Sequence, residues 1–279
     1  MINFYRNLGV AVIALSPFIT RSQDTSSAHT FVDAIEDNSY LIEEAYNQEH
    51  RVVQHISNGY INSISDTGFV YSFTQEWPIK SVKHQLSYTV PYTTVRGIES
   101  MSGFGDVMIN YRYQLFYKED WACVSPRLSI ILPTGDEKKE LGMNTVGLQI
   151  NLPVSKRVSD HWVWHFNAGS TFYPNVEFTD SSLIQQNTNL VFYNIGGSVI
   201  WLAGSKFNIM LECLENFNSE IGVDGSIVST NETILNPGFR FAIDIKELQI
   251  VPGFSLPISI VGDRYNVNGF AYLSFEHSF

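Results

Sequence analysis

The sequence predicts an all-β fold, a transmembrane antiparallel β-barrel of about twelve strands, with a short N-terminal segment as a candidate plug of the lumen. Three observations favour this fold class: long segments in which apolar and polar residues alternate, connections that alternate between short and long, and a final strand that ends in an aromatic residue. Only 16% of the residues are charged and 14% are aromatic, which suits a chain whose two faces meet lipid and water. We therefore treat the chain as one barrel domain behind an N-terminal leader.

The first 22 residues have the layout of a secretory signal peptide, with Arg6 ahead of a short apolar run from Leu8 to Ile19. That run is too short to cross a membrane as a helix, and no other apolar run approaches ~18 residues. The predicted organisation is a signal peptide at residues 1–22, a periplasmic or plug segment at 23–51 and the barrel at 52–279.

The segment from Phe31 to Glu49 shows no alternation, and its apolar residues fit helical spacing better. It carries several acidic residues, among them Glu43 and Glu44. We expect this segment to be helical and to precede the barrel wall rather than form part of it.

The stretch from Gly105 to Pro133 shows the strand pattern most clearly. Every second residue from 107 to 117 is apolar or aromatic, and the alternation restarts after a short polar turn. Each segment keeps its alternation for ~11 residues, the length that crosses a bilayer at a tilt. Arg112 and Arg127 lie in the middle of the polar faces, where a water-filled lumen accepts an arginine and a soluble core rejects it.

Similar alternation recurs to the end of the chain. The predicted strands are 52–61, 68–77, 84–95, 105–117, 121–132, 145–155, 161–173, 189–202, 206–217, 230–244, 247–259 and 267–279. Short connections, such as 118–120 and 204–205, interleave with longer ones, such as 133–144 and 174–188, as periplasmic turns and outer loops do in outer-membrane barrels. Both termini are then expected in the periplasm.

The last predicted strand ends at Phe279, with apolar residues at alternate positions before it, and such an ending is typical of bacterial membrane barrels. Three prolines, Pro126, Pro237 and Pro252, fall inside predicted strands. A proline cannot donate to the strand ladder, so we expect bulges or shifted strand ends at these positions.

The inward positions of the predicted strands carry mostly polar side chains. The lumen-lining candidates are Arg112, Arg127, Arg240, Glu212, Asn110, Gln114, His165, Asn194 and Gln249. Two interpretations stay open at this stage: a hydrated passage whose charges select solutes, and a sealed barrel in which these groups satisfy one another. The first makes the protein a channel or transporter, and the second makes it a closed structural or interaction barrel of the outer membrane.

The acidic N-terminal segment offers a more specific hypothesis. A charge in a confined site requires a partner, so Glu43 and Glu44 are expected to fold back into the lumen and pair with Arg112, Arg127 or Arg240. The segment would then be a plug. The alternative is an unattached periplasmic tail.

Some inward positions are apolar. They are Phe270, Tyr272, Met108, Ile131, Val163 and Met210. Inner apolar patches of this kind would favour hydrophobic or aromatic solutes over sugars. The alternative is that they pack against the N-terminal segment.

Several function classes fit the composition poorly. The formal net charge of −11 argues against nucleic acid, which needs a basic surface. Cys123 and Cys213 are isolated thiols without the clustered spacing of a zinc site, so we expect no metal and no cofactor. His55 and Ser57 have the spacing used by membrane-barrel lipid hydrolases, but no orienting partner can be named. That enzyme class stays a remote alternative, and we expect no enzyme.

Two blocks of the sequence resemble a known family. The first runs from Gly103-Phe104-Gly105-Asp106 into Asn110-Tyr111-Arg112-Tyr113 and leaves through Pro126-Arg127 and Leu132-Pro133-Thr134-Gly135-Asp136. The second runs from Asp37 to His55. Both are similar to bacterial outer-membrane transporter-like proteins linked to the meta pathway of phenol degradation.

This resemblance implies a location in the outer membrane of a Gram-negative bacterium. It implies a porin-like channel or transporter for small, hydrophobic or aromatic solutes. The expected partners are outer-membrane lipid and lipopolysaccharide, the small-molecule solute, and the barrel-assembly machinery, which would recognise the C-terminal strand ending in Phe279.

Overall fold

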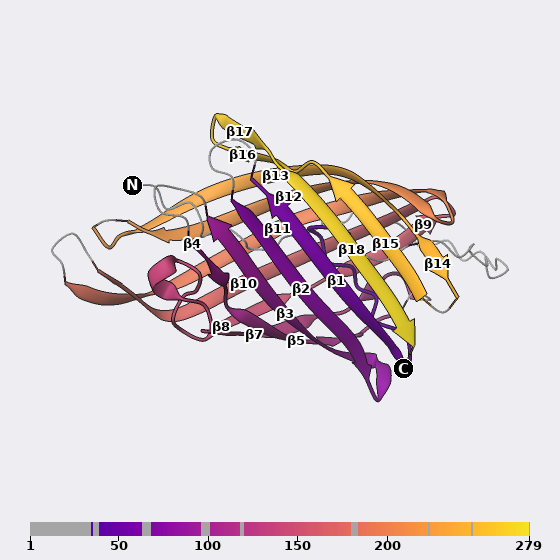
Figure 1. Cartoon of the computed structure of the whole chain (residues 1–279), viewed down its shortest axis with the longest axis horizontal. Coiled ribbons are helices and arrows are strands. Elements are labelled where there is room, and N and C mark those ends of the chain that lie inside the picture. The colour runs from indigo at the N-terminus through magenta and orange to yellow at the C-terminus, as the bar shows by residue number, and fades with distance from the viewer. Residues whose placement is uncertain are drawn as a thin grey trace.

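The computed structural model of the chain describes residues 35, 39–62, 68–95, 101–117, 120–179, 184–222, 224–246 and 248–278. These residues form a closed antiparallel barrel of tilted strands (Figure 1). The predicted signal peptide and the terminal Phe279 lie outside the described residues. Within that part of the chain, no helix has the length and apolar character needed to cross a membrane.

The strands follow one another around the barrel in chain order. The first are β1 Val52–Ile61, β2 Phe69–Ile79, β3 Ser81–Val95, β4 Met101–Phe104, β5 Val107–Tyr113, β6 Cys123–Val124, β7 Arg127–Leu132, β8 Gly147–Asn151 and β9 Val154–Ser159. They continue with β10 Trp162–Thr179, β11 Gln185–Gly204, β12 Phe207–Ile221, β13 Ile227–Phe241, β14 Ile243–Ile245, β15 Leu248–Ser255, β16 Ile258–Val261, β17 Arg264–Val267 and β18 Gly269–Ser278. A single turn of 3-10 helix, η1 Glu137–Lys139, lies between β7 and β8 in the described residues.

The eighteen labelled strands make twelve antiparallel spans in the wall of the described barrel. The numbers differ because six of the spans are interrupted and carry two strand labels each. The interrupted spans are β4 with β5, β6 with β7, β8 with β9, β13 with β14, β15 with β16, and β17 with β18. β1 pairs with β18 along its whole length and closes the barrel, and Figure 1 shows β18 between β1 and β15. Every predicted strand overlaps one of these spans, so the predicted twelve-stranded barrel is confirmed.

The connections differ in length between the two ends of the barrel. β2 and β3 are joined through Lys80 alone, which has a φ of 60°, whereas residues 133–146 join β7 to β8. We call the two ends the short-turn end and the long-loop end. Val52 and Ser278 are opposite each other at the ends of the closing pair of strands. They lie at the short-turn end, because β1 also pairs with β2 and places Gln54 opposite Glu76, close to the Lys80 connection.

The prolines shape the wall in a way that corrects the expectation of bulges. Pro126 lies in the gap between β6 and β7, as a shifted strand end would. Pro237 and Pro252, however, stay in register with Leu211 and Leu273, and the interruption falls on the opposite neighbour instead. A strand residue directs its N–H to one neighbour only, so a proline weakens one ladder and leaves the other intact.

The two faces of the wall differ in exposure as the alternation predicts. On β7, Leu128 and Ile130 are 50% and 43% exposed, whereas Ser129 and Ile131 are 0% and 4% exposed. The apolar side chains therefore point outward, and the inward side chains are covered. What covers many of them is a stretch of the chain itself.

Residues 39–49, which we call the inner segment, run through the barrel interior between Ile35 and β1. The prediction of a helix over 31–49 is wrong for these residues, which have no helical conformation. Their backbone N–H groups donate to side chains of the barrel wall, so the hydrogen bonds that a helix would make within itself are used elsewhere. Residues 31–34 and 36–38 lie outside the described part.

Candidate functional site

Glu212 on β12 receives the first part of the inner segment. Its side chain is fully buried, and the backbone N–H groups of Tyr40, Leu41 and Ile42 all donate to it, at N–O distances of 2.8 to 3.3 Å. Asn236 Nδ2 is a fourth donor to this carboxylate, at 2.6 Å. Successive N–H groups that converge on one carboxylate form a backbone anion nest, so a predicted lumen-lining acid holds main chain rather than an arginine.

Glu43 lies between two arginines of the opposite wall. Its carboxylate accepts from Arg127 Nε at 2.9 and 3.0 Å and from Arg112 Nη1 at 3.3 Å. Asn151 Nδ2 donates to the same carboxylate at 2.6 Å. Arg112 also lies 3.7 Å from Glu44 and 3.4 Å from Glu76 on β2. We call Glu43, Glu44, Glu76, Arg112 and Arg127 the ion cluster.

Arg112 binds the backbone of the inner segment as well as its acids. Nη1 donates to the carbonyl of Glu44 at 2.8 Å, and Nη2 donates to the carbonyl of Tyr46 at 3.0 Å. The arginine is 2% exposed, so these bonds form out of contact with bulk water. One planar guanidinium therefore pairs with the acidic side chains of the segment and also holds its backbone in place.

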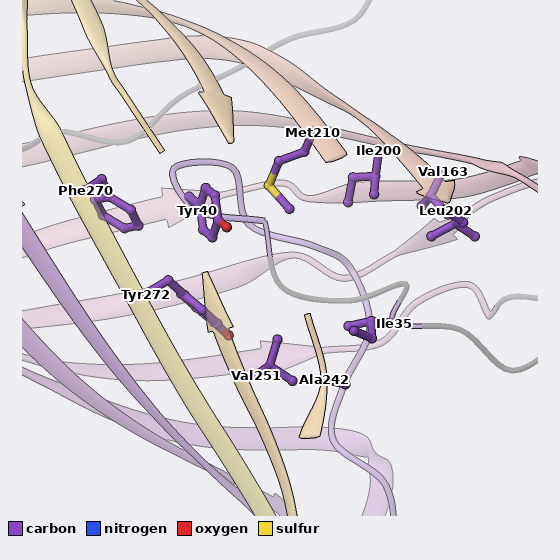
Figure 2. Packing of buried hydrophobic residues seen from close by; sticks show 10 residues of the cluster. All are labelled: Ile35, Tyr40, Val163, Ile200, Leu202, Met210, Ala242, Val251, Phe270 and Tyr272. Atoms are coloured by element: carbon purple, nitrogen blue, oxygen red, sulfur yellow. The ribbon is translucent and has the colours of Figure 1, made fainter. Parts of the chain in front are cut away.

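Tyr40 anchors the segment to the other side of the interior. Its ring lies 5.3 Å from the ring of Phe270 and 5.5 Å from that of Tyr272, and Figure 2 shows it between the inner faces of the strands. The buried residues packed together here, which we call the aromatic cluster, are Ile35, Tyr40, Val163, Ile200, Leu202, Met210, Ala242, Val251, Phe270 and Tyr272. The phenol of Tyr40 donates to the carbonyl of Phe239.

Two glycines make room for that ring. A Cβ atom on Gly238 of β13 would lie 2.6 Å from a ring carbon of Tyr40, and one on Gly253 of β15 would lie 2.2 Å from its hydroxyl oxygen. Both distances are far below van der Waals contact, so neither position accepts a side chain while Tyr40 is in place. The wall is shaped to receive this residue of the inner segment.

The other predicted lumen residues are spread over the interior. Asn110 accepts from Arg127 at 3.0 Å, and the Gln114 oxygen accepts from the N–H of Asn47 at 3.4 Å. His165 is fully buried, with Nδ1 2.6 Å from Ser155 Oγ, and Asn194 is also buried.

Arg240 and Gln249 do not join the ion cluster. Arg240 is fully buried, and its Nη2 donates to the carbonyl of Ile35 at 3.1 Å. Gln249 lies near the short-turn end, where it donates to Asp244 at 2.9 Å. Of the three arginines proposed as partners of Glu43 and Glu44, the structure brings two to them.

Sequence reasoning missed four residues of this site: Glu76, Tyr40, Gly238 and Gly253. The strand phase that places Trp77 outward also places Glu76 inward, so alternation alone could have found it. A glycine inside a strand is a signal of close approach, which applies to Gly238 and Gly253. No local pattern marks Tyr40, since it lies in a segment without regular structure.

The hydrolase interpretation receives no support from the contacts of its two residues. Ser57 Oγ lies 3.0 Å from the hydroxyl of Tyr71, and His55 Nε2 lies 3.2 Å from Nε2 of His277. Each side chain thus has a different partner, and the nucleophile–base pair that such chemistry requires is not formed. In the described residues, no group of three or more His, Cys, Asp or Glu side chains is arranged to hold a metal ion.

Solved structures with a similar fold are outer-membrane barrels. An outer membrane channel from Pseudomonas putida F1 matches with a TM-score of 0.63 and 12% identity, over 83% of this chain and 96% of that one. The NanC porin matches with a TM-score of 0.49 and 9% identity, over 81% of this chain and 100% of that one. The CymD monoaromatic hydrocarbon channel matches with a TM-score of 0.45 and 10% identity, over 83% and 89%.

The first of these likenesses shows a shared fold, that of an outer-membrane barrel. No family model matches the chain, and no curated protein matches it either. The function must therefore be argued from the interior of this barrel.

Proposed function

We propose that the protein is an outer-membrane channel for small solutes in which the inner segment is a displaceable plug. The observation that carries the proposal is the way the wall uses its polar groups. Glu212, Arg112, Ser155 and Gln85 make hydrogen bonds to the main chain of the inner segment. Water can replace each of these bonds when the segment leaves, so the wall would be a hydrated passage without it.

The aromatic cluster supports a particular class of solute. Removing the inner segment would uncover Phe270, Tyr272 and Met210, which now pack against Tyr40. A passage with this apolar patch beside a polar wall suits small hydrophobic or aromatic solutes. The resemblance to proteins linked to phenol degradation supports the same class.

The remaining partners belong to the same proposal. The outward apolar face would contact outer-membrane lipid and lipopolysaccharide, and the C-terminal strand would be recognised by the barrel-assembly machinery. The signal peptide at 1–22 remains a sequence prediction, and a precursor that keeps these residues after export would contradict it.

A reversible cross-link tests the plug directly. Ala45 and Cys123 pack together in one buried cluster, and Cys123 Sγ lies 3.1 Å from the carbonyl oxygen of Ala45, so an Ala45→Cys substitution would bring a second thiol close to Cys123. Cys213 is outward and is changed to serine to prevent wrong pairing. In planar bilayers, the oxidised variant should conduct far less than the same protein after reduction, because the plug is tethered only when oxidised. A free-thiol assay verifies that the disulfide forms, and the Cys213→Ser protein alone is the matched control.

A closed structural barrel is the second candidate, and the burial of the inner face by the segment favours it. The two functions differ in one measurement. A closed barrel would show no conductance and no solute uptake in liposomes in either redox state of the cross-linked variant, and that result would refute the channel.

A further inference from the structure

Two histidines face each other across the seam where the barrel closes. His55 on β1 is opposite Phe275 of β18, and His277 is opposite Val53, so the histidines are diagonal neighbours on the outer face. Their Nε2 atoms lie 3.2 Å apart. Both are near the short-turn end, and His277 is exposed.

The tautomer of His277 is set by its backbone neighbour. Its Nδ1 lies 3.0 Å from the carbonyl oxygen of Ser278. A carbonyl can only accept, so Nδ1 carries the proton and the Nε2 of the neutral ring presents a lone pair. Histidines that bind metals are typically oriented in this way, with the second ring nitrogen donating to a carbonyl.

The ring of His55 is also held in place. It stacks on Phe275, with ring centroids 4.6 Å apart, and lies 6.1 Å from the ring of Phe73 at an angle of 26°. These ring contacts restrain the plane of the His55 ring without using either ring nitrogen, and the two imidazole rings lie 5.4 Å apart between centroids at an interplanar angle of 21°. The pair is therefore organised before any ligand arrives.

We propose that His55 and His277 form a binding site for a divalent transition-metal ion, of the zinc, copper or nickel class, across the seam between the first and last strands. Two nitrogens that share a tetrahedral ion at ~2.0–2.1 Å are about 3.3 Å apart, close to the observed separation. Imidazole suits these metals, and two coordination positions remain for water. The simpler arrangement is a hydrogen-bonded pair in which His55 donates to His277 and no metal binds.

Zinc titration of the purified full barrel in detergent micelles distinguishes the two arrangements. We expect one zinc ion per chain and at least a tenfold loss of affinity in His55→Gln and in His277→Gln. His84→Gln is the matched control, because His84 is another outward histidine with an aromatic partner, Tyr111, 2.6 Å from its Nδ1. That control should bind zinc like the unaltered protein.

A second measurement reports the ligands themselves. Copper(II) bound to the unaltered protein should give an electron paramagnetic resonance spectrum with two nitrogen ligands, and each single variant should lose one of them. Heat-dependent mobility on gels shows that each variant is folded. Equal zinc affinity in the unaltered protein and a double variant, or absence of zinc binding at millimolar concentration, would overturn the proposal. Neither readout depends on conductance, so the site stands or fails separately from the channel.

Discussion

The ion cluster and the aromatic cluster hold the same eleven-residue stretch, residues 39–49, by different physics. The ion cluster uses directed bonds between charged groups, with Glu43 between Arg112 and Arg127 at 2.9 to 3.3 Å. The aromatic cluster uses shape, with the ring of Tyr40 against Phe270 and Tyr272. On one side of the barrel, pairing of charges therefore fixes the path of the segment, whereas on the other side close packing excludes other positions of the Tyr40 ring.

The two regions also differ in how well their charges are paired. Arg112 and Arg127 share three carboxylates in the ion cluster. Beside the aromatic cluster, Nε and Nη1 of the fully buried Arg240 have no hydrogen-bond partner among the described residues. Nε of Arg112 has none either, so the described contacts leave one guanidinium nitrogen unpaired in the ion cluster and two beside the aromatic cluster. A guanidinium without full pairing is costly in an apolar site, and the described contacts pair Arg112 more fully than Arg240.

Breaking the ion cluster should have the largest effect. Arg112→Met removes the cation shared by Glu43, Glu44 and Glu76 and also two hydrogen bonds to the inner segment. Removing one partner of a buried ion pair costs about 3–5 kcal/mol, so the free energy of unfolding should fall by that order. Urea unfolding of the micelle-bound barrel, followed by tryptophan fluorescence, measures it. A change below about 1 kcal/mol would mean that the charges of this region are already solvated.

The aromatic side should give an intermediate effect, and it can be tested by a double-mutant cycle. Gly253→Ala places a methyl group where the Tyr40 hydroxyl lies, and overpacking of this kind costs about 1–3 kcal/mol. In a Tyr40→Ala background the same methyl group has room, so its effect on unfolding should nearly vanish. Gly204→Ala, at a glycine with nothing within 4 Å, is the matched control. If Gly253→Ala lowered the free energy of unfolding equally in both backgrounds, Tyr40 would not be the residue that packs against Gly253.

An ion pair on the protein surface should give the smallest effect. Lys206 Nζ lies 2.8 Å from Asp244, as close as the buried contacts, but its side chain is 59% exposed. Solvent screens such a pair, so Lys206→Gln should change the free energy of unfolding by less than about 0.5 kcal/mol. The same urea experiment measures it. A loss comparable to that of Arg112→Met would show that burial is not what separates the two pairs.

Much of the wall could be predicted from the sequence because strand alternation is local. The spacing of Val107, Ile109 and Tyr111 decides which face meets lipid, and the same spacing places Arg112 inside. The pairing of Glu43 with an arginine follows from the cost of a confined charge, and the structure forms it with Arg112 and Arg127. The local pattern could not show which of the three inward arginines would pair with Glu43, since Arg240 also lies at an inward position.

The conformation of the inner segment shows where sequence reasoning failed. Its apolar spacing suggested a helix, but its N–H groups donate to Glu212, Asn167 and Ser155, which belong to three different strands, β12, β10 and β9. Helical spacing predicts hydrogen bonds between backbone groups of the same segment, but here side chains of the barrel wall accept from the N–H groups instead. Only the closed barrel brings those acceptors together.

The number of strands, their inward and outward faces and the presence of charge in the interior could be predicted from the amino-acid sequence, because each depends on residues that are neighbours in the chain. The tertiary structure alone decided what fills that interior. Tyr40 contacts Gly253, and His55 contacts His277, only because the barrel closes. Contacts between positions more than two hundred residues apart produce no periodic pattern in the sequence.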